Sequence, residues 1–259
     1  MDPDRAGSRP DLAASASRSA PAVSIVLPVY NEGPAVVPVL LGLERDVHST
    51  HEILVVYDFD GDTTVPAVMA VQGELPTVRL LKNELGRGVL NAMKAGIAAC
   101  AAPYIVISMA DGSDEPSDID RMVALARSGA DLVAASRYMP GGRQLGGPLI
   151  KRTLSRAAGL SLHWFASVPI HDPTSNFKLY GRAFLDSVTI ESDAGFELAL
   201  ELSVKATLAH RHLAEVPTTW RDRTSGESHF KLRAWLPHYL RWYVAAFRGR
   251  WLPRAAISR

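Results

Sequence analysis

The sequence predicts an α/β protein with a doubly wound, mostly parallel sheet flanked by helices. Short apolar runs rich in Val, Ile and Leu recur through the first half of the chain: VSIVLPV, EILVVY, TVRLL, YIVIS and DLVAAS. They lack strict polar and apolar alternation, which is typical of parallel strands that are buried on both faces. Segments of helical character separate these runs, and this alternation of strand and helix indicates a doubly wound open sheet.

Length, charge and cysteine content exclude several classes of protein. The chain has 259 residues, 28 Lys and Arg against 27 Asp and Glu, and a net charge of +1. This length suits one large domain or two small ones. The balanced charge excludes a generally basic nucleic-acid binder, so no nucleic-acid partner is expected. The single cysteine, Cys100, excludes a disulfide scaffold and fits a reducing compartment.

In the first half of the chain, helices are expected between the strands, at about 33–46, 64–73, 86–102 and 117–128. In the second half, residues 147–170 form an apolar segment that is too short and too charged to span a bilayer. Two interpretations stay open for it: a core helix with a solvated first turn, or a helix that lines an apolar acceptor groove. A helix at about 194–209 and a strand LAEVPTTW follow.

The chain divides into three expected parts. Residues 1–21 have no apolar period and are predicted to be disordered. Residues 22–234 form the main domain, and residues 235–259 form a basic amphipathic helix and tail. From Arg221 onward the chain has nine Arg or Lys and only two acids, whereas the part before it is acidic. This basic tail is expected to bind an anionic partner.

The C-terminal helix at 235–251 is predicted to have one apolar face. Its members recur at spacings of three and four: Leu236, Leu240, Tyr243, Phe247 and Trp251. Three arginines flank that face: Arg241, Arg248 and Arg250. Such a helix can lie in a membrane interface. Alternatively, the face packs on the protein's own body or on a second subunit.

Polar side chains follow three of the predicted strands. The first strand leads into Pro28-Val29-Tyr30-Asn31-Glu32, the second into Asp58-Phe59-Asp60-Gly61-Asp62, and the fourth into Asp111-Gly112-Ser113-Asp114. Ordinary turns and helix caps often have this composition. However, ligands of doubly wound sheets bind beyond the carboxyl ends of the strands. Neighbouring carboxylates repel one another there, so a cation is expected between them.

Six strings in this order resemble the inverting family 2 glycosyltransferases, most closely the dolichyl/polyprenyl-phosphate mannose synthase group. They are SIVLPVYNE, YDFDGDTT, MADGSD, SRYMPGG, DPTSNFKLY and EVPTTWRDRTSGES. The resemblance runs from about Val23 to Lys231. It implies the GT-A fold, a nucleotide-binding α/β sheet whose acceptor-side elements come from the second half of the chain.

The resemblance also implies a donor site and a metal. The nucleotide-binding residues would be Pro28, Tyr30, Asn31, Glu32, Asp58 and Asp62. Asp111 matches the last aspartate of the family's Asp-x-Asp string and would hold Mg²⁺ or Mn²⁺. The first aspartate is replaced by Met109, so Ser113 and Asp114 are expected to complete the metal ligands.

Basic residues of the second half would hold phosphate groups in such an enzyme. The expected catalytic residues are Asp111, Arg137 and Arg223. The expected acceptor-binding residues are Lys151, Arg152, Arg156, Ser175 and His229. Asp172 is interpreted either as a turn cap or as a residue with a chemical role.

The expected reaction moves a hexose, with GDP-mannose as the first donor, to a polyprenyl phosphate with inversion. A phosphate monoester has a second pKa of about 6 and is largely ionised at neutral pH, so it needs cationic positioning more than a base. We expect a cytoplasmic enzyme, peripheral at the membrane through its C-terminal helix. Two alternatives remain: a transferase for a soluble acceptor, or a non-catalytic subunit that binds nucleotide sugars.

Overall fold

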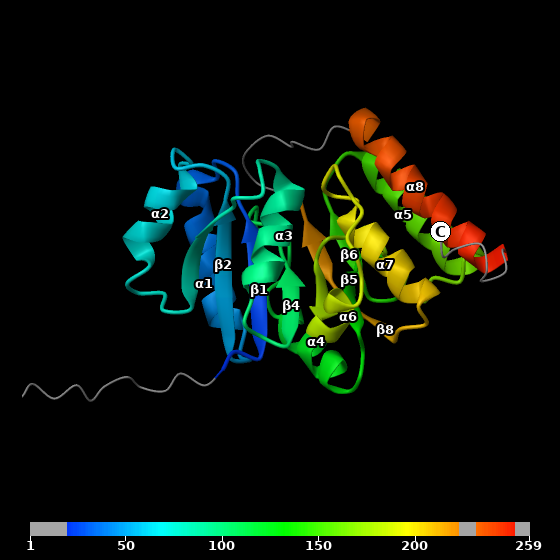
Figure 1. Ribbon diagram of the computed structural model, residues 1–259, viewed down its shortest axis with the longest axis horizontal. Coiled ribbons are helices and arrows are strands. Elements are labelled where there is room, and N and C mark those ends of the chain that lie inside the picture. The colour runs from blue at the N-terminus through cyan, green and yellow to red at the C-terminus, as the bar shows by residue number, and fades with distance from the viewer. Residues whose placement is uncertain (1–19, 223–231, 252–259) are drawn as a thin grey trace, which may run out of the picture.

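The computed structural model describes residues 20–222 and 232–251. Helices cover both faces of a seven-stranded sheet with the strand order β3-β2-β1-β4-β7-β5-β8 (Figure 1). The strands are β1 Val23–Pro28, β2 His51–Tyr57, β3 Val78–Lys82, β4 Tyr104–Ile107, β5 Leu132–Ser136, β6 Arg143–Leu145, β7 Lys178–Gly181, β8 Leu213–Pro217 and β9 Thr219–Arg221. The helices are η1 Gly33–Ala35, α1 Val36–Asp46, α2 Thr64–Val71, α3 Val89–Ala99, α4 Asp118–Arg127, α5 Leu149–Phe165, α6 Arg182–Asp186, α7 Leu198–Leu208 and α8 Leu232–Trp251.

Every pairing in the large sheet is parallel except those of β7, so the predicted mostly parallel sheet is confirmed. β7 lies antiparallel between β4 and β5, where Lys178 pairs with Ile107 on one side and Ala134 on the other. The loop that precedes β7 therefore opens at the same edge as the carboxyl ends of β4 and β5. The apolar runs did not predict β7, β6 or α6, which are only three to five residues long.

The strands separate two apolar cores, one on each face of the sheet. Ile25 and Leu27 belong to the core beneath α1, α2 and α4, whereas Val26 belongs to the core beneath α3, α6 and α7. Successive side chains of a strand point to opposite faces, so a run without polar residues fills both cores. The sheet's carboxyl edge, which carries the polar loops, is thus held by rigid strands.

The strand predicted as LAEVPTTW is interrupted in the structure. β8 ends at Pro217, and after Thr218 the chain continues as β9, which pairs with β6 in a separate two-stranded sheet. Thr218 donates its N–H to the carbonyl of Ser136 at 3.1 Å and is the crossing point between the two sheets. This second sheet lies next to the end of β5.

The C-terminal helix α8 begins at Leu232, three residues before the predicted start, and packs against α5 and α7 (Figure 1). The predicted apolar face is divided in the structure. Tyr243 and Phe247 pack against the core, together with the buried Trp242, whereas Leu236 and Leu240 are exposed. Packing on the protein's own body thus applies to part of the predicted face, and membrane contact by its exposed residues stays a prediction.

Within the described ranges, no helix combines the length and the apolarity that a membrane crossing requires. Two predicted parts of the chain lie largely or partly outside the described residues. They are the disordered lead-in, apart from its last two residues, and the last eight residues of the basic tail.

Candidate active site

The loop after β1 is joined to the loop after β2 by a buried carboxylate. Asp62 is 1% exposed and accepts the backbone N–H of Asn31 at both oxygens, each at 3.1 Å, and that of Thr64 at 2.8 Å. The N–H of Glu32 donates to the Thr64 hydroxyl at 3.0 Å. Asn31 has a φ of 55°, a left-handed conformation that asparagine tolerates better than most residues. Asp62, predicted to bind nucleotide, thus fixes the backbone of Asn31 and Glu32.

Asp58 performs the same task for the loop after β3. Its oxygens accept the side-chain N–H of Asn83 at 2.7 Å and the backbone N–H of Gly88 at 2.8 Å. Gly88 has a φ of 123°, which only glycine adopts readily. Asn83, which directly follows β3, was not a predicted site residue, because an asparagine after a strand is usual in turns.

An aromatic surface lies beside these loops. Tyr30 is 49% exposed, and its ring lies 5.9 Å from that of Phe59. The guanidinium of Arg87 is 4.8 Å from the Phe59 ring centroid. Pro28, also predicted to bind nucleotide, is the buried last residue of β1 and pairs with Val56. Flat, exposed rings beside hydrogen-bonding loops can bind a nucleotide base by stacking.

The acidic loop after β4 contains the three predicted metal ligands. Asp111 Oδ1 accepts the N–H of Ser113 at 3.1 Å. Asp114 turns back toward the strand, where its Oδ2 accepts the hydroxyl of Ser108 at 2.9 Å and the N–H of Met109 at 3.0 Å. Burial, with the charge of Asp111 adding to it, raises the pKa of Asp114 to about 7.

This donor set fits a divalent cation at Asp111. The charge of Asp111 helps to raise the pKa of the nearby Asp114, and a hard cation with oxygen ligands would relieve this repulsion. Asp114 contacts its own strand end, and Ser113 is buried with its carbonyl bonded to the N–H of Arg221. Metal binding by these two residues stays a prediction. Among residues 20–222 and 232–251, the strand-end acids do not converge into a compact group of three ligand atoms.

Arg137, predicted to be catalytic, directly follows β5 and is 12% exposed at its side chain. Its Nε and Nη2 donate to the two oxygens of Asp172 at 2.6 and 3.0 Å. Burial alone would raise the pKa of Asp172, but the Arg137 guanidinium holds that pKa below its usual value. The structure thus gives Asp172 an electrostatic role besides the predicted turn cap, in which it accepts the N–H of Ser175 at 3.2 Å.

Lys178, which was not a predicted site residue, completes this buried group. Its ammonium is fully buried and donates to the carbonyls of Asp172, at 3.1 Å, and Ser175. Burial lowers the pKa of Lys178 to about 7, although the nearby Asp172 carboxylate favours its charged form. Burial, to which the charge of Arg137 adds, thus favours the neutral amine of Lys178, whereas Asp172 raises the pKa of Arg137 and keeps that guanidinium charged.

Helix α5 brings the predicted acceptor residues to this group. Ser155 bonds to the hydroxyls of Tyr138 and Thr174 at 3.0 and 2.9 Å, which docks the helix on the β5 and β7 loops. Arg156 is exposed, and its charge acts on the Tyr138 hydroxyl, whose pKa burial raises. Arg152 lies one helical turn earlier and is half-buried.

Within the described ranges, Arg152 and Arg156 have no ion-pair partner, in contrast to Arg137. Two unpaired guanidinium groups on one helix can bind an anion such as a phosphate. The predicted Ser175 is half-buried and lies in the loop before β7. Lys151 lies in α5, but its side chain, like the whole of Arg223 and His229, is outside the described part of the chain.

The geometry therefore combines an aromatic surface beside the strand-end loops, an acidic loop and a helix that carries arginines. Residues 24–189, more than half of the chain, match the family model described as glycosyl transferase family 2. The chain belongs to glycosyl transferase family 2. It is accordingly a glycosyltransferase, and both the predicted family and the predicted class of enzyme are confirmed.

Known relatives agree with this membership, and a solved structure agrees with the predicted fold. The undecaprenyl-phosphate mannosyltransferase of Micrococcus luteus is 27% identical over 80% of this chain and 86% of its own length. The polyprenol monophosphomannose synthase of Mycolicibacterium smegmatis is 28% identical over 79% of each chain. The glucosyl-3-phosphoglycerate synthase of Mycobacterium tuberculosis, solved with Mn²⁺, UDP and glucosyl-3-phosphoglycerate, superposes with a TM-score of 0.65 at 17% identity. It covers 91% of this chain and 82% of its own, which confirms the GT-A fold.

Proposed function

We propose that this glycosyltransferase moves a hexose from a nucleotide sugar, with GDP-mannose as the expected donor, to a polyprenyl phosphate with inversion at the anomeric carbon. The observation that carries this proposal is the pair of relatives named for polyprenyl-phosphate mannosyl transfer, which align over 80% and 79% of the chain. Helix α5 supports it independently, because it presents two arginines, without ion-pair partners among the described residues, on the same helix as exposed apolar side chains.

On the donor side, the base and ribose would lie on Tyr30 and against the loop of Asn31 and Glu32, with Asp58 at the base. Asp62 would be a positioning residue that holds this loop through its backbone N–H groups. Asp111 would hold Mg²⁺ or Mn²⁺, which, when bound, supplies positive charge to the leaving diphosphate as a Lewis acid.

On the acceptor side, Arg152 and Arg156 would bind the acceptor phosphate. The phosphate oxygen attacks the anomeric carbon as the bond to the diphosphate breaks, and direct displacement inverts that carbon. Since a phosphate monoester is already largely ionised at neutral pH, these arginines have to orient it rather than deprotonate it. Arg137 would keep Asp172 and the β7 loop in place, and Arg223 and His229 are proposed to meet further phosphate charge.

The polyprenyl chain would reach the site from a membrane surface. Helix α5 exposes Leu154, Trp164 and Phe165, and the neighbouring α8 exposes Leu236 and Leu240. Exposed apolar residues flanked by arginines are typical of helices that lie in a membrane interface. We accordingly propose a peripheral enzyme at the cytoplasmic face of a membrane.

The proposal is tested by incubating the protein with Mn²⁺, a polyprenyl phosphate in detergent and a panel of radiolabelled GDP- and UDP-sugars. Label from one donor should pass into the organic phase, and Asp111→Asn should abolish the transfer. Label that appears only in a water-soluble product would favour a soluble acceptor instead. Donor binding without turnover on any acceptor would favour a non-catalytic subunit.

A further inference from the structure

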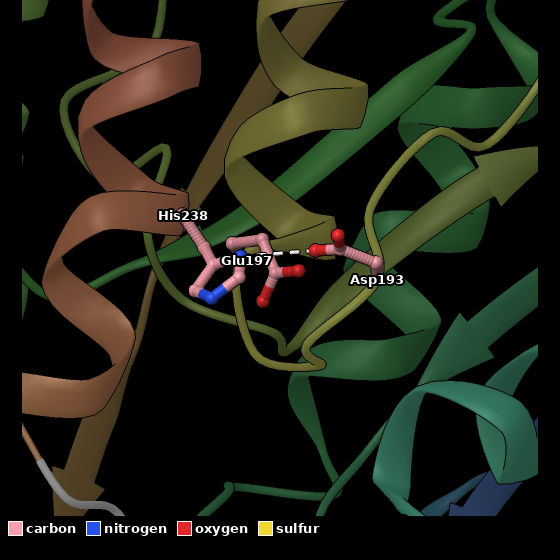
Figure 2. A group of neighbouring side chains, drawn as sticks. All are labelled: Asp193, Glu197 and His238. Carbon is pink, nitrogen blue, oxygen red and sulfur yellow. Dashed lines mark hydrogen bonds and ion pairs between the residues drawn. The ribbon is translucent and has the colours of Figure 1, made fainter.

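A small cavity lies between the beginning of α7 and the first turns of α8. It has a volume of about 140 Å³, and its lining includes Ser192, Asp193, Glu197 and His238. Asp193 lies on the loop that leads to α7, Glu197 directly precedes that helix, and His238 projects from α8 (Figure 2). These elements differ from the strand-end loop that contains Asp111.

The three titratable side chains converge as metal ligands do. One ligand atom from each of Asp193, Glu197 and His238 lies within 4.8 Å of the others. His238 Nδ1 and Asp193 Oδ1 are 2.9 Å apart, and the figure marks this contact (Figure 2). A Zn²⁺ ion binds nitrogen and oxygen ligands at about 2.0–2.2 Å, so ligand atoms of one ion are close neighbours of this kind.

Glu197 is a buried carboxylate that has no ion-pair partner among residues 20–222 and 232–251. It is 1% exposed, and its oxygens accept the backbone N–H groups of Ala194 and Gly195 at 2.9 and 2.7 Å. One helical turn later, the equally buried Glu201 pairs with Lys205 at 2.8 Å. No described Lys, Arg or His side chain pairs with Glu197 in this way. Because a buried charge without a counter-charge is costly, a cation in the cavity would stabilise this glutamate.

Ser192 supplies an independent sign that this cavity binds a ligand. Its side chain is 4% exposed, and its Oγ has no hydrogen-bond partner among the described residues. Buried hydroxyl groups almost always have a partner, and this one belongs to the lining of the same cavity. A metal ion, or a water bound to it, would provide that partner.

The one arginine in the lining does not neutralise the acidic pair. Arg241 Nη2 lies 2.5 Å from Glu191 Oε2, and its guanidinium stacks over the Trp242 ring at 4.8 Å. Its charge is therefore balanced by Glu191, outside the group of three ligands.

We propose that Asp193, Glu197 and His238 bind one divalent transition-metal ion, with Zn²⁺ as the best match, and that this ion fixes α8 to the beginning of α7. One imidazole and two carboxylates suit Zn²⁺, and the Ser192 hydroxyl or a water provides the fourth ligand. The two carboxylate charges balance the charge of the ion. The site is structural, and it does not depend on the identity of the donor or acceptor.

The test is isothermal titration of ZnSO₄ into the full-length protein after treatment with a chelator. The wild type should bind one Zn²⁺ that His238→Ala and Asp193→Asn each lose or bind far more weakly. Removal of a residue that only supports a metal ligand lowers metal affinity about 10- to 100-fold. We expect each of these two substitutions to lower the Zn²⁺ affinity by more than that. The melting temperature of the wild type should rise with Zn²⁺, and that of His238→Ala should not.

His212→Ala and Asp111→Asn are the matched controls, because they remove an exposed histidine and the strand-end acid without touching the cavity. Both should keep the cavity ion. If His238→Ala and Asp193→Asn, shown to be folded by circular dichroism, bind Zn²⁺ as the wild type does, the proposal is wrong. Loss of the ion in Asp111→Asn alone, or a wild type without bound Zn²⁺, would also overturn it.

Discussion

The buried ion pair of Arg137 with Asp172 connects the end of β5 to the loop before β7. Both side chains lie below the surface, and the two guanidinium contacts measure 2.6 and 3.0 Å. Asp172 also accepts the N–H of Ser175, so one carboxylate orders the loop next to the predicted acceptor site. We therefore assign Arg137 a positioning role in the described arrangement.

Replacing Asp172 with asparagine should destabilise the fold by about 3–5 kcal/mol, because the shape is kept while the buried Arg137 loses its counter-charge. Urea unfolding measures this change. Asp60→Asn is the matched control, since Asp60 pairs with Lys82 at 2.7 Å but is 79% exposed, and it should have little effect. Equal effects of the two substitutions would contradict the assignment.

Lys178 gives the stability of the protein a defined pH dependence. Burial lowers its folded-state pKa to about 7, whereas the unfolded chain has the usual value of about 10.4. Above pH 7 the unfolded state therefore binds a proton that the folded state does not, and the free energy of unfolding rises with pH. The contribution is at most about 1.4 kcal/mol per pH unit.

This dependence is tested by urea unfolding of the wild type and of Lys178→Met at about six pH values between 7.0 and 8.5. The variant should lose the part of the upward slope that belongs to Lys178. Lys82→Met, which removes an exposed lysine, should keep the slope of the wild type. A Lys178→Met slope equal to that of the wild type would show that the ammonium stays charged in the folded protein.

At the scale of elements, α5 packs closely against the loop before β7, because Gly159 of the helix lies at the point of contact. A Cβ on Gly159 would lie 2.6 Å from the carbonyl oxygen of His171. Alanine favours helices by about 1 kcal/mol over glycine, but overpacking of this kind costs about 1–3 kcal/mol. Gly159→Ala should therefore be destabilised and should bind the acceptor less well, because α5 has to move away from the loop.

Thermal unfolding and the KM for the acceptor measure the two effects. Gly73→Ala is the control, since a Cβ there has no atom within 4 Å. A Gly159→Ala protein that is more stable than the wild type would mean that α5 does not pack as described.

The exposed apolar residues of α5 and α8 predict binding to anionic vesicles. Leu240 on α8 is 53% exposed, and burying a leucine is worth about 1.5–3 kcal/mol. Leu240→Glu should therefore weaken binding about tenfold in a vesicle sedimentation assay. Leu41→Glu changes a leucine on α1 that is 48% exposed, and it should bind as the wild type does. Equal loss in both variants would exclude α8 as the membrane contact.

At the scale of the whole molecule, the fold could be predicted because its main strands are buried on both faces. The run VSIVLPV, which contains Ile25 and Val26, has no strict alternation of polar and apolar residues, and this pattern predicts a parallel strand. The position of β7 could not be predicted, because only pairing with distant strands gives this short segment its place. Pro217 and Thr218 were similarly predicted to lie inside one strand, but in the structure the chain passes there from the large sheet to the two-stranded sheet.

The candidate site residues were predicted partly from position and partly from the family resemblance. Asp111 follows a strand and matches the family's metal-binding string, and Arg152 and Arg156 fall in the acceptor segment; their roles stay predictions. Asp172 and Lys178 could not be given their roles, because these depend on burial beside Arg137, which the sequence does not reveal. The same holds for Asp58 and Asp62, whose carboxylates turn out to hold backbone N–H groups of neighbouring loops.

The central claim is that this glycosyltransferase uses a polyprenyl phosphate, bound by the arginines of α5. The most direct test measures kcat/KM for three acceptors: a polyprenyl phosphate, the corresponding polyprenol and a soluble phosphate monoester. It compares the wild type with Arg156→Ala and with the control Arg127→Ala, which changes an exposed arginine on α4. We predict turnover of the polyprenyl phosphate alone, reduced at least about tenfold in Arg156→Ala, a loss that corresponds to one charged phosphate contact. Equal or faster turnover of the soluble phosphate or the polyprenol, or an Arg156→Ala enzyme as active as Arg127→Ala, would contradict the account.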